Sequence, residues 1–310
     1  MPAFNAKRQA LELLSPFISH TPKPRPEKRK GNKKIRAVST KHTYTGTMTA
    51  IARWQKKEHG GTLHRMTRQH ALQYLEGRSH VVSQKTLDRD RVVLQFLPRT
   101  GKSGLPRIKS SVDPGALSTE SRAYEHAQLA QITSRQGARN ALSTELSWRC
   151  GWRAHELLTV RRWDSLTKEE QEQLLAHGKW DPRIWENRPG EWYVVDGKGG
   201  LDRISVVPPD LVERLEARKL PEGGRIVQDR EIDYRQFYDL AGGVKWSSSF
   251  SKASQRCFGW SSGGHGCRHT YAQDRYSAYR AEGMDPTTAR ELVAQEMGHF
   301  RDRVTMVYLR

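Results

Sequence analysis

Residues 265–272 read HGCRHTYA, which sets two histidines and an arginine close together in the last third of the chain. Three further short segments of the C-terminal half carry cationic or nucleophilic side chains. They are GWRAHELL at 151–158, GKGG at 197–200, and MGH at 297–299, with a tyrosine at 308, nine residues after the histidine. Each segment alone is typical of an ordinary surface or core position. Their joint order and spacing indicate one composite site.

The segment 197–200 lies between two runs with strand-forming residues, 191–195 and 203–207. Such runs around a glycine-rich tip predict a β-hairpin that carries Lys198 at its turn. The rest of this half favours helices, which begin at caps such as Asp285 before Pro286. We therefore expect a mainly α fold with a small β-hairpin or sheet in the C-terminal domain, an α+β arrangement.

The sequence upstream predicts three helices between residues 39 and 97. Ser39 or Thr40 begins the first, Thr67 the second and Ser83 the third. Their expected ends are Gly60, Gly77 and Pro98. The polar faces of these helices are basic, as in a helical module that grips DNA, although the apolar stripes alone indicate only a helical domain.

These patterns divide the chain into four parts: a basic N-terminal tail or arm (1–36), a helical domain (37–97), a linker (98–118) and a C-terminal domain (119–310). Residues 23–36 read KPRPEKRKGNKKIR, and their prolines and glycine oppose regular structure. Such a segment either follows a phosphate backbone or is a solvated tail. The linker is rich in proline, glycine and serine.

The composition limits the class of protein. The 310 residues include 53 lysines and arginines against 34 acidic residues, a net charge of +19, which points to a polyanionic partner. Nucleic acid is the first candidate and an anionic membrane surface the second. No apolar run approaches the ~20 residues of a membrane span, and the N-terminus lacks a signal-peptide pattern, so we expect a cytoplasmic, nucleoid-associated protein. Three cysteines without a C-x-x-C pair indicate neither a disulfide framework nor structural zinc.

The order of the four segments resembles the tyrosine recombinase (phage integrase) family, most clearly over residues 119–310 and more loosely over 39–97. The resemblance implies that 119–310 is the catalytic domain and that 37–97 is a helical core-binding domain that contacts DNA. By this resemblance Tyr308 is the nucleophile and Lys198 the general acid. The remaining catalytic positions are Arg153, Arg268, His265 and His299, and Glu156 is a supporting residue. The resemblance implies cleavage and rejoining of DNA through a 3′-phosphotyrosyl intermediate, without ATP or metal. The sequence contains no nucleotide-binding loop, so no cofactor is expected.

The expected partner is a double-stranded recombination site, bound by a homotetramer that is a monomer or weak oligomer when free, with no membrane partner. A mobile genetic element is the expected source. The expected DNA-binding residues are Lys28, Arg29, Lys30, Lys33, Lys34, Arg36, Lys41, Lys85 and Arg89. Two alternatives stay open: a type IB-like topoisomerase with similar tyrosine chemistry, and a relative that binds DNA without catalysis. Trp152 departs from the family pattern, where a smaller aliphatic residue is usual.

Overall fold

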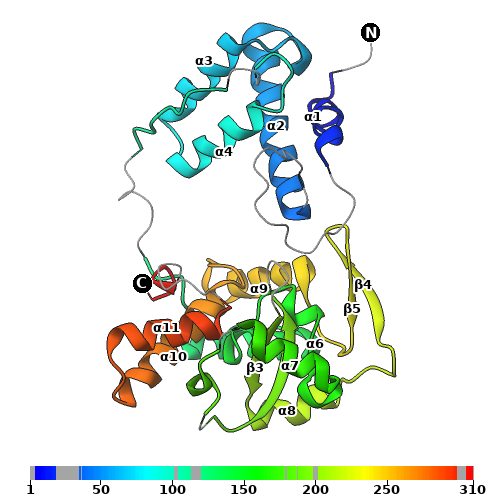
Figure 1. Ribbon diagram of the computed structural model, residues 1–310, viewed down its shortest axis with the longest axis vertical. Helices are drawn as coiled ribbons and strands as arrows, with labels where there is room; N and C mark the ends of the chain where they lie inside the picture. Colours follow the sequence, from blue (N-terminus) through cyan, green and yellow to red (C-terminus); the bar gives the residue numbers. More distant parts are fainter. Residues whose placement is uncertain are drawn as a thin grey trace. The chain divides into compact units, whose positions relative to one another are not determined.

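The computed structural model describes residues 4–18, 35, 37–100, 104–112, 120–178, 180–186, 188–197, 202–298 and 305–309. The chain forms two compact units, Met1–Thr119 and Glu120–Arg310 (Figure 1). The described residues are mainly helical, with small antiparallel sheets confined to the second unit, so the predicted fold class is confirmed. No helix in these ranges combines the length and the hydropathy that a bilayer span requires.

The first unit is built from α-helices around one apolar core. The helices are α1 (Ala6–Leu14), α2 (Val38–His59), α3 (Arg68–Ser79) and α4 (Gln84–Leu94), with 3₁₀ turns η1 (Ser15–Phe17) and η2 (Leu63–Arg65). Met48 and Ile51 of α2, Leu75 of α3 and Leu94 of α4 are fully buried in this core. Burial of the apolar stripes holds the helices together, since each stripe alone would face water.

The helix ends follow local signals, with three differences from the predictions, one of which is that α4 ends at Leu94, ahead of Pro98. Gly60 ends α2 in the left-handed conformation, at φ +67°, and its N–H donates to the carbonyl of Lys56. The side chain of Thr67 caps α3 by accepting from the N–H of His70. However, α2 begins after Ala37, earlier than predicted. Gly77 lies inside α3 and does not end it, because the tertiary contacts of Tyr74, Leu75 and Ser79 outweigh the low helix propensity of one glycine.

Two stretches assigned to the tail and the linker belong partly to the first core. Ala10 and Leu14 of α1 are fully buried, and α1 packs along α2. In the linker segment, Leu105 is buried, because Arg68 and Arg91 donate to the carbonyls of residues 104 and 105 and draw this stretch onto the helices. Lys28, Arg29, Lys30, Lys33, Lys34 and Arg36 lie outside the described residues.

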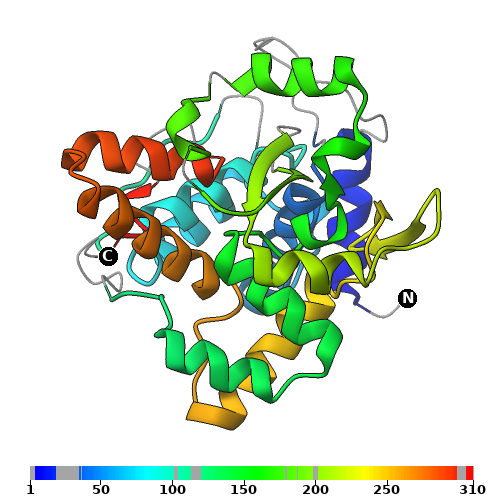
Figure 2. The ribbon, with the colours of Figure 1, turned by 90° about the horizontal axis from the view of Figure 1, so that it is seen from below.

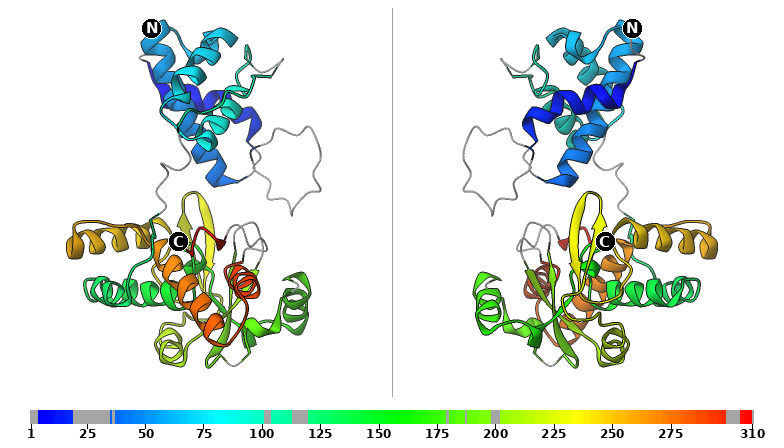
Figure 3. Two further views of the ribbon diagram at one scale, coloured as in Figure 1. Left: turned by 90° about the vertical axis from the view of Figure 1, so that its left-hand side faces the viewer. Right: turned by 90° about the vertical axis from the view of Figure 1, so that its right-hand side faces the viewer.

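The second unit contains more helices and two antiparallel sheets. Its α-helices are α5 (His126–Ser134), α6 (Ala138–Arg149), α7 (Lys168–Gly178), α8 (Pro209–Glu216), α9 (Gly243–Phe258), α10 (Gly266–Ala281) and α11 (Pro286–Glu296). Its strands are β1 (Arg161–Arg162), β2 (Glu191–Asp196), β3 (Asp202–Val207), β4 (Arg225–Asp229) and β5 (Ile232–Gln236). Short 3₁₀ turns occur at η4 (Glu156–Leu158), η5 (Trp163–Ser165) and η6 (Pro182–Ile184). Figures 2 and 3 show α7 and α9 at opposite sides of this unit.

The predicted hairpin is present as β2 and β3, which pair from Glu191 opposite Val207 to Asp196 opposite Asp202. β1 adds to the outer edge of β2. Lys198 lies outside the described residues. A second hairpin, β4–β5, has no counterpart in the predictions. Its turn residues Arg230 and Glu231 have φ of 49° and 63°, a conformation for which sequence signals normally require glycine or asparagine.

The helices of the second unit place the segments of the predicted site. α6 packs on both α9 and α10, and α10 packs beside α11. The fully buried rings of Trp152 and Phe250 and the nearly fully buried Trp246 lie in the core between them. Trp152, at the position where the family has a smaller residue, is thus a core side chain, and its neighbour Arg153 leaves the core at a fixed point.

The cap at Thr67 generates a stability prediction for the first unit. Thr67→Ala removes the acceptor for the N–H of His70, and we expect a loss of about 1 kcal/mol in the free energy of unfolding. Thr62→Ala is the matched control, because Thr62 precedes η2 without a side-chain cap bond. Urea unfolding of the unit measures both variants. Equal losses for the two would contradict the assigned cap.

Candidate active site

Four of the six predicted catalytic residues, and the supporting residue Glu156, lie in described parts of the second unit. Arg153 follows α6 in the loop before η4, His265 immediately precedes α10, and Arg268 lies in the first turn of α10. Tyr308 lies in the segment 305–309, beyond α11. His299, like Lys198, lies outside the described residues. The structure brings Arg153, His265, Arg268 and Tyr308 together around one small volume, although up to 155 positions of the chain separate them.

Gly151 sets the turn that presents Arg153. Its φ is +64°, and a Cβ at this position would lie 2.5 Å from the ring of Tyr271. Only glycine fits both conditions without strain. The carbonyl of Gly151 accepts hydrogen bonds from the guanidinium groups of Arg268 and Arg203. The turn is therefore a fixed acceptor against which two arginines are aligned.

Arg153 and Arg268 share a backbone acceptor, the carbonyl of Met297. Arg153 donates to it at 3.3 Å and Arg268 at 3.0 Å. Arg268 is fully buried, whereas 13% of the Arg153 side chain is exposed. Burial and the neighbouring Arg153 lower the pKa of Arg268, but a guanidinium remains charged at neutral pH. Two positive charges are thus held side by side at the edge of the unit's core.

Glu156 lies between these arginines and is completely buried. One carboxylate oxygen accepts from the Arg153 side chain at 2.5 Å, and the other accepts from the Arg153 backbone N–H and from Arg203, each at 2.8 Å. Burial alone would raise the pKa of Glu156, but the guanidinium groups of Arg203, Arg268 and Arg153 outweigh it and hold the pKa well below its usual value. The carboxylate is therefore ionised and orients the arginines.

Arg203, which the sequence analysis did not single out, is a member of this cluster. It lies on β3 with 1% of its surface exposed. Besides Glu156, it donates to the carbonyl of Glu296 at 2.6 Å and to that of Gly151 at 3.2 Å. One sequence signal could have identified Arg203. It begins a predicted strand whose other residues are mostly apolar, which indicates that the strand is buried, and a buried arginine requires a charged partner.

The phenol of Tyr308 faces the histidine. Its hydroxyl lies 3.1 Å from Nε2 of His265, and its ring lies 5.9 Å from the guanidinium carbon of Arg268. Burial of the His265 ring is the main cause that lowers its pKa, and the charge of Arg268 is the second. This imidazole is therefore neutral at neutral pH. A neutral imidazole has a free lone pair that can accept a hydrogen bond from the phenol. Tyr308 itself is 6% exposed.

His269, one turn further along α10, also contacts the phenol. Its ring centroid lies 4.6 Å from that of Tyr308. Burial, followed by the charges of Arg122 and Arg268, lowers the pKa of His269 to about 4. The neutral ring packs on the tyrosine and helps to fix its position, a role that the sequence analysis did not assign.

A second buried carboxylate secures the end of α11. Glu296 is 4% exposed and accepts from the hydroxyls of Tyr271 and Tyr279 and from Arg275. Arg188 lies 3.3 Å from the same carboxylate. Burial opposes ionisation, but Arg188 and Arg275 prevail and keep the pKa of Glu296 below its usual value. This anchoring fixes the chain at Met297, whose carbonyl accepts hydrogen bonds from Arg153 and Arg268.

A pocket of about 260 Å³ opens beside the arginines. Its lining includes Arg153, His155, His265 and Arg268, with Trp152 and Trp246 behind them. Trp152 Nε1 and Arg268 Nε are buried donors with no hydrogen-bond partner within the described residues. The two guanidinium groups in this lining suit an oxyanion.

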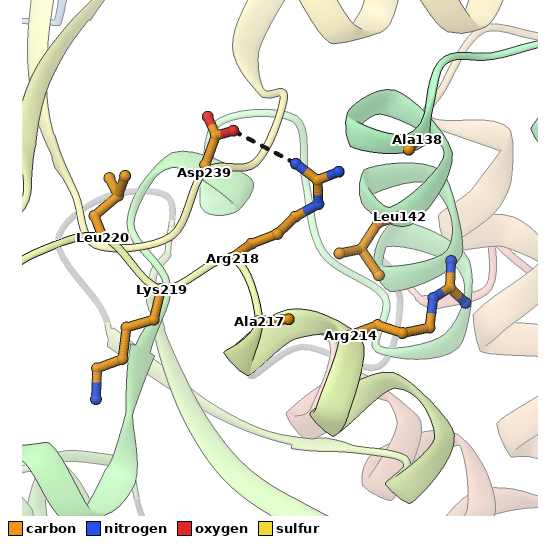
Figure 4. A pocket seen from close by; sticks show the side chains of 8 residues that line it. All are labelled: Ala138, Leu142, Arg214, Ala217, Arg218, Lys219, Leu220 and Asp239. Atoms are coloured by element: carbon orange, nitrogen blue, oxygen red, sulfur yellow. Dashed lines mark hydrogen bonds and ion pairs between the residues drawn. The ribbon is translucent and has the colours of Figure 1, made fainter.

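A larger cavity of about 570 Å³ shares no residue with this site. It lies where α6 begins and α8 ends, and Figure 4 shows Arg218 directed towards Asp239 across it. Arg214, also in its lining, is held by Glu145 at 2.6 and 2.7 Å. Neighbouring carboxylates thus pair with both of these arginines.

The described DNA-binding candidates all lie in the first unit. Lys41 is on α2, and Lys85 and Arg89 are one turn apart on α4, where Lys85 is exposed. Arg89 lies 3.6 Å from the buried carboxylate of Asp90, so part of its charge is balanced within the unit. Two other basic residues of this unit, Arg68 and Arg91, hold the segment 104–105, as described above.

Comparison with known proteins gives the fold. No protein-family model and no curated protein matches the chain. Among solved structures, a XerH site-specific recombinase bound to palindromic difH substrate, in a post-cleavage complex, is 14% identical with a TM-score of 0.50, over 88% of this chain and 75% of that chain. A lambda integrase (75–356) dimer bound to a COC′ core site is 16% identical with a TM-score of 0.50, over 91% and 90%. The chain has the fold of these tyrosine recombinases.

The fit around Gly151 can be tested by a pair of substitutions. Gly151→Ala imposes a strained φ and drives a methyl group into Tyr271, so we expect a loss of about 2–5 kcal/mol in the free energy of unfolding. Gly259→Ala is the control, because Gly259 has a φ of +73° but open space around it, and we expect about 1–2 kcal/mol. Denaturant titration measures both, and equal costs would show that the contact with Tyr271 does not matter.

Proposed function

We propose that this protein is a site-specific DNA recombinase or integrase that breaks and rejoins strands through a covalent bond to Tyr308. The observation that carries the proposal is the position of the Tyr308 hydroxyl, 3.1 Å from a neutral histidine and beside the paired guanidinium groups of Arg153 and Arg268. The fold shared with a site-specific recombinase and an integrase also supports this proposed function.

Arg153 and Arg268 bind the scissile phosphate in this proposal. A phosphodiester carries one negative charge, which repels an anionic nucleophile unless it is neutralised. The pocket is lined by both arginines, whose guanidinium groups can donate to the non-bridging oxygens. Charge on these oxygens grows in the pentacoordinate transition state, so the arginines stabilise that state more than the ground state.

Tyr308 then attacks phosphorus while His265 accepts the phenolic proton. An isolated phenol has a pKa near ~10, so only about a thousandth is ionised at neutral pH without a base. A bond forms between phosphorus and the phenol oxygen, and the bond from phosphorus to the 5′ oxygen of the next nucleotide breaks. The product is a 3′-phosphotyrosyl link and a free 5′ end.

The leaving 5′ oxygen requires a proton, and we assign its delivery to Lys198, with His299 donating to the phosphate. Both residues lie outside the described ranges, so their roles rest on the family resemblance. The phosphotyrosyl bond conserves the energy of the phosphodiester. A 5′ hydroxyl from another strand can therefore attack it and release Tyr308, which needs neither ATP nor metal. Double-stranded DNA is the proposed partner, bound by a tetramer during exchange.

Incubation with duplexes from the DNA that flanks its own gene tests this function, followed by mapping of the tyrosine link. Exchange between two defined sites supports a recombinase, and the paired sites reveal integration, excision or resolution. Relaxation of any supercoiled plasmid without site preference would indicate a type IB-like topoisomerase instead. Binding without any covalent adduct would indicate a relative that has lost catalysis.

Removal of the nucleophile alone gives a sharp prediction. Tyr308→Phe keeps the ring but removes the attacking oxygen, so we expect no covalent adduct on a nicked suicide substrate and a duplex Kd within about twofold of the original. Tyr276→Phe is the control, since Tyr276 packs against the same core cluster and is expected to react normally. Denaturing gel electrophoresis detects the adduct. An adduct in Tyr308→Phe would assign the chemistry to another residue.

The basic segment 23–36 is proposed to contact phosphates. Removal of residues 1–36 would also remove α1 from the core, so replacement by glutamine of Lys28, Arg29, Lys30, Lys33, Lys34 and Arg36 is the cleaner change. We expect weaker binding and a slope of log K against log salt that is reduced by up to about 5. Fluorescence anisotropy at several salt concentrations measures it, with Lys168→Gln/Lys219→Gln as a control. An unchanged slope would assign the segment to a solvated tail.

A further inference from the structure

Arg203 holds together the backbone segments that carry the site. Its guanidinium donates to the carbonyl of Gly151, two residues before Arg153, and to the carbonyl of Glu296, next to Met297. A longer contact of 3.4 Å joins it to the carbonyl of Cys150. β3 thereby connects the turn after α6 with the end of α11, and both of these segments supply acceptors for the catalytic arginines.

The same guanidinium also changes the charge balance of the site. Glu156 lies 2.8 Å from Arg203, 2.5 Å from Arg153 and 3.7 Å from Arg268. These groups sum to three positive charges and one negative charge, a net charge of +2. Without Arg203, the carboxylate would be shared by Arg153 and Arg268 alone, and the net charge that faces a phosphate would fall to +1. In a buried site of low dielectric constant this difference is large.

Neutral donors could satisfy the hydrogen bonds of Glu156. However, they would leave the negative charge of the carboxylate to be offset by Arg153 and Arg268 alone. Arg203 instead lets the carboxylate orient Arg153 and Arg268 while another cation offsets it. The fit is close, because a Cβ on Gly298, whose φ is +67°, would lie 3.3 Å from Cδ of Arg203. The chain beyond α11 thus turns directly over the arginine.

We propose that Arg203 is a positioning residue for strand cleavage, which acts through Glu156 by offsetting its charge so that Arg153 and Arg268 keep theirs for the phosphate. The proposal rests on the function proposed above. It does not require Arg203 to contact DNA, because only 1% of the residue is exposed.

A matched pair of substitutions separates charge from packing. Arg203→Lys and Arg203→Gln both shorten the side chain and keep a hydrogen-bond donor, but only lysine keeps the positive charge. With saturating suicide substrate, we expect the adduct to form about 100-fold more slowly in Arg203→Gln and within about tenfold of the original rate in Arg203→Lys. Duplex affinity is expected to change less than threefold in either variant.

A double-mutant cycle tests whether Arg203 acts through Glu156. Glu156→Gln removes the charge that Arg203 offsets, so Arg203→Gln should cost less than about tenfold in that background. Equal costs in both backgrounds would overturn the proposal, as would equal rates for the lysine and glutamine variants. Circular dichroism checks the fold, and loss of the fold in both single variants would assign Arg203 to folding alone.

A control and a second readout complete the test. Arg78→Gln removes a guanidinium from the buried carboxylate of Asp90 in the other unit, and its adduct rate per folded molecule is expected to be unchanged. Orthovanadate, a tetrahedral oxyanion, is titrated while the tryptophan fluorescence of the protein is followed, because Trp152 and Trp246 line the pocket, and Arg153→Ala serves as the blank. We expect weaker vanadate binding in Arg203→Gln than in Arg203→Lys, and equal binding would overturn the proposal. If the original protein forms no adduct, the proposed function fails while this titration still decides the role of Arg203.

Discussion

The organisation of the second unit depends on one buried carboxylate, Glu156, which cannot stay ionised in the core without cations around it. Arg153 and Arg268 satisfy it from the side of the pocket, and Arg203 does so from the sheet. This requirement ties the turn at residue 151, strand β3 and the first turn of α10 into one geometry. The arginines are held before any substrate arrives, so little reorganisation is left for the moment of reaction.

The sequence predicted the features that rest on local rules or on the reacting side chains. The β2–β3 hairpin follows from two strand-like runs around a glycine-rich tip, and the cap at Thr67 follows from the preference of threonine for that position. The candidate site could be assembled because its residues recur in a fixed order in a known family. The structure adds that Arg153, Arg268, His265 and Tyr308 meet in space, which spacing along the chain cannot establish.

The features that were missed depend on contacts between distant segments. In the sequence, Arg203 is one polar residue in a predicted strand. Only the structure shows its contacts with Glu156 and with the end of α11. The β4–β5 hairpin turns at Arg230 and Glu231, without glycine or asparagine, so the usual signal is absent. Residues 104–112 have the composition of a linker, yet two arginines of the first unit fix part of this stretch through backbone carbonyls, whose acceptor strength does not depend on residue type.

The scant exposure of Tyr308 has a biological consequence. A phenol that is 6% exposed and covered by imidazole rings is shielded from random encounters with solvent or with stray duplexes. The strand transfer proposed above needs no ATP, so no fuel-consuming step would stop an accidental cut. Under that proposal, the burial of Tyr308 limits cleavage by access to the phenol rather than by its chemical reactivity.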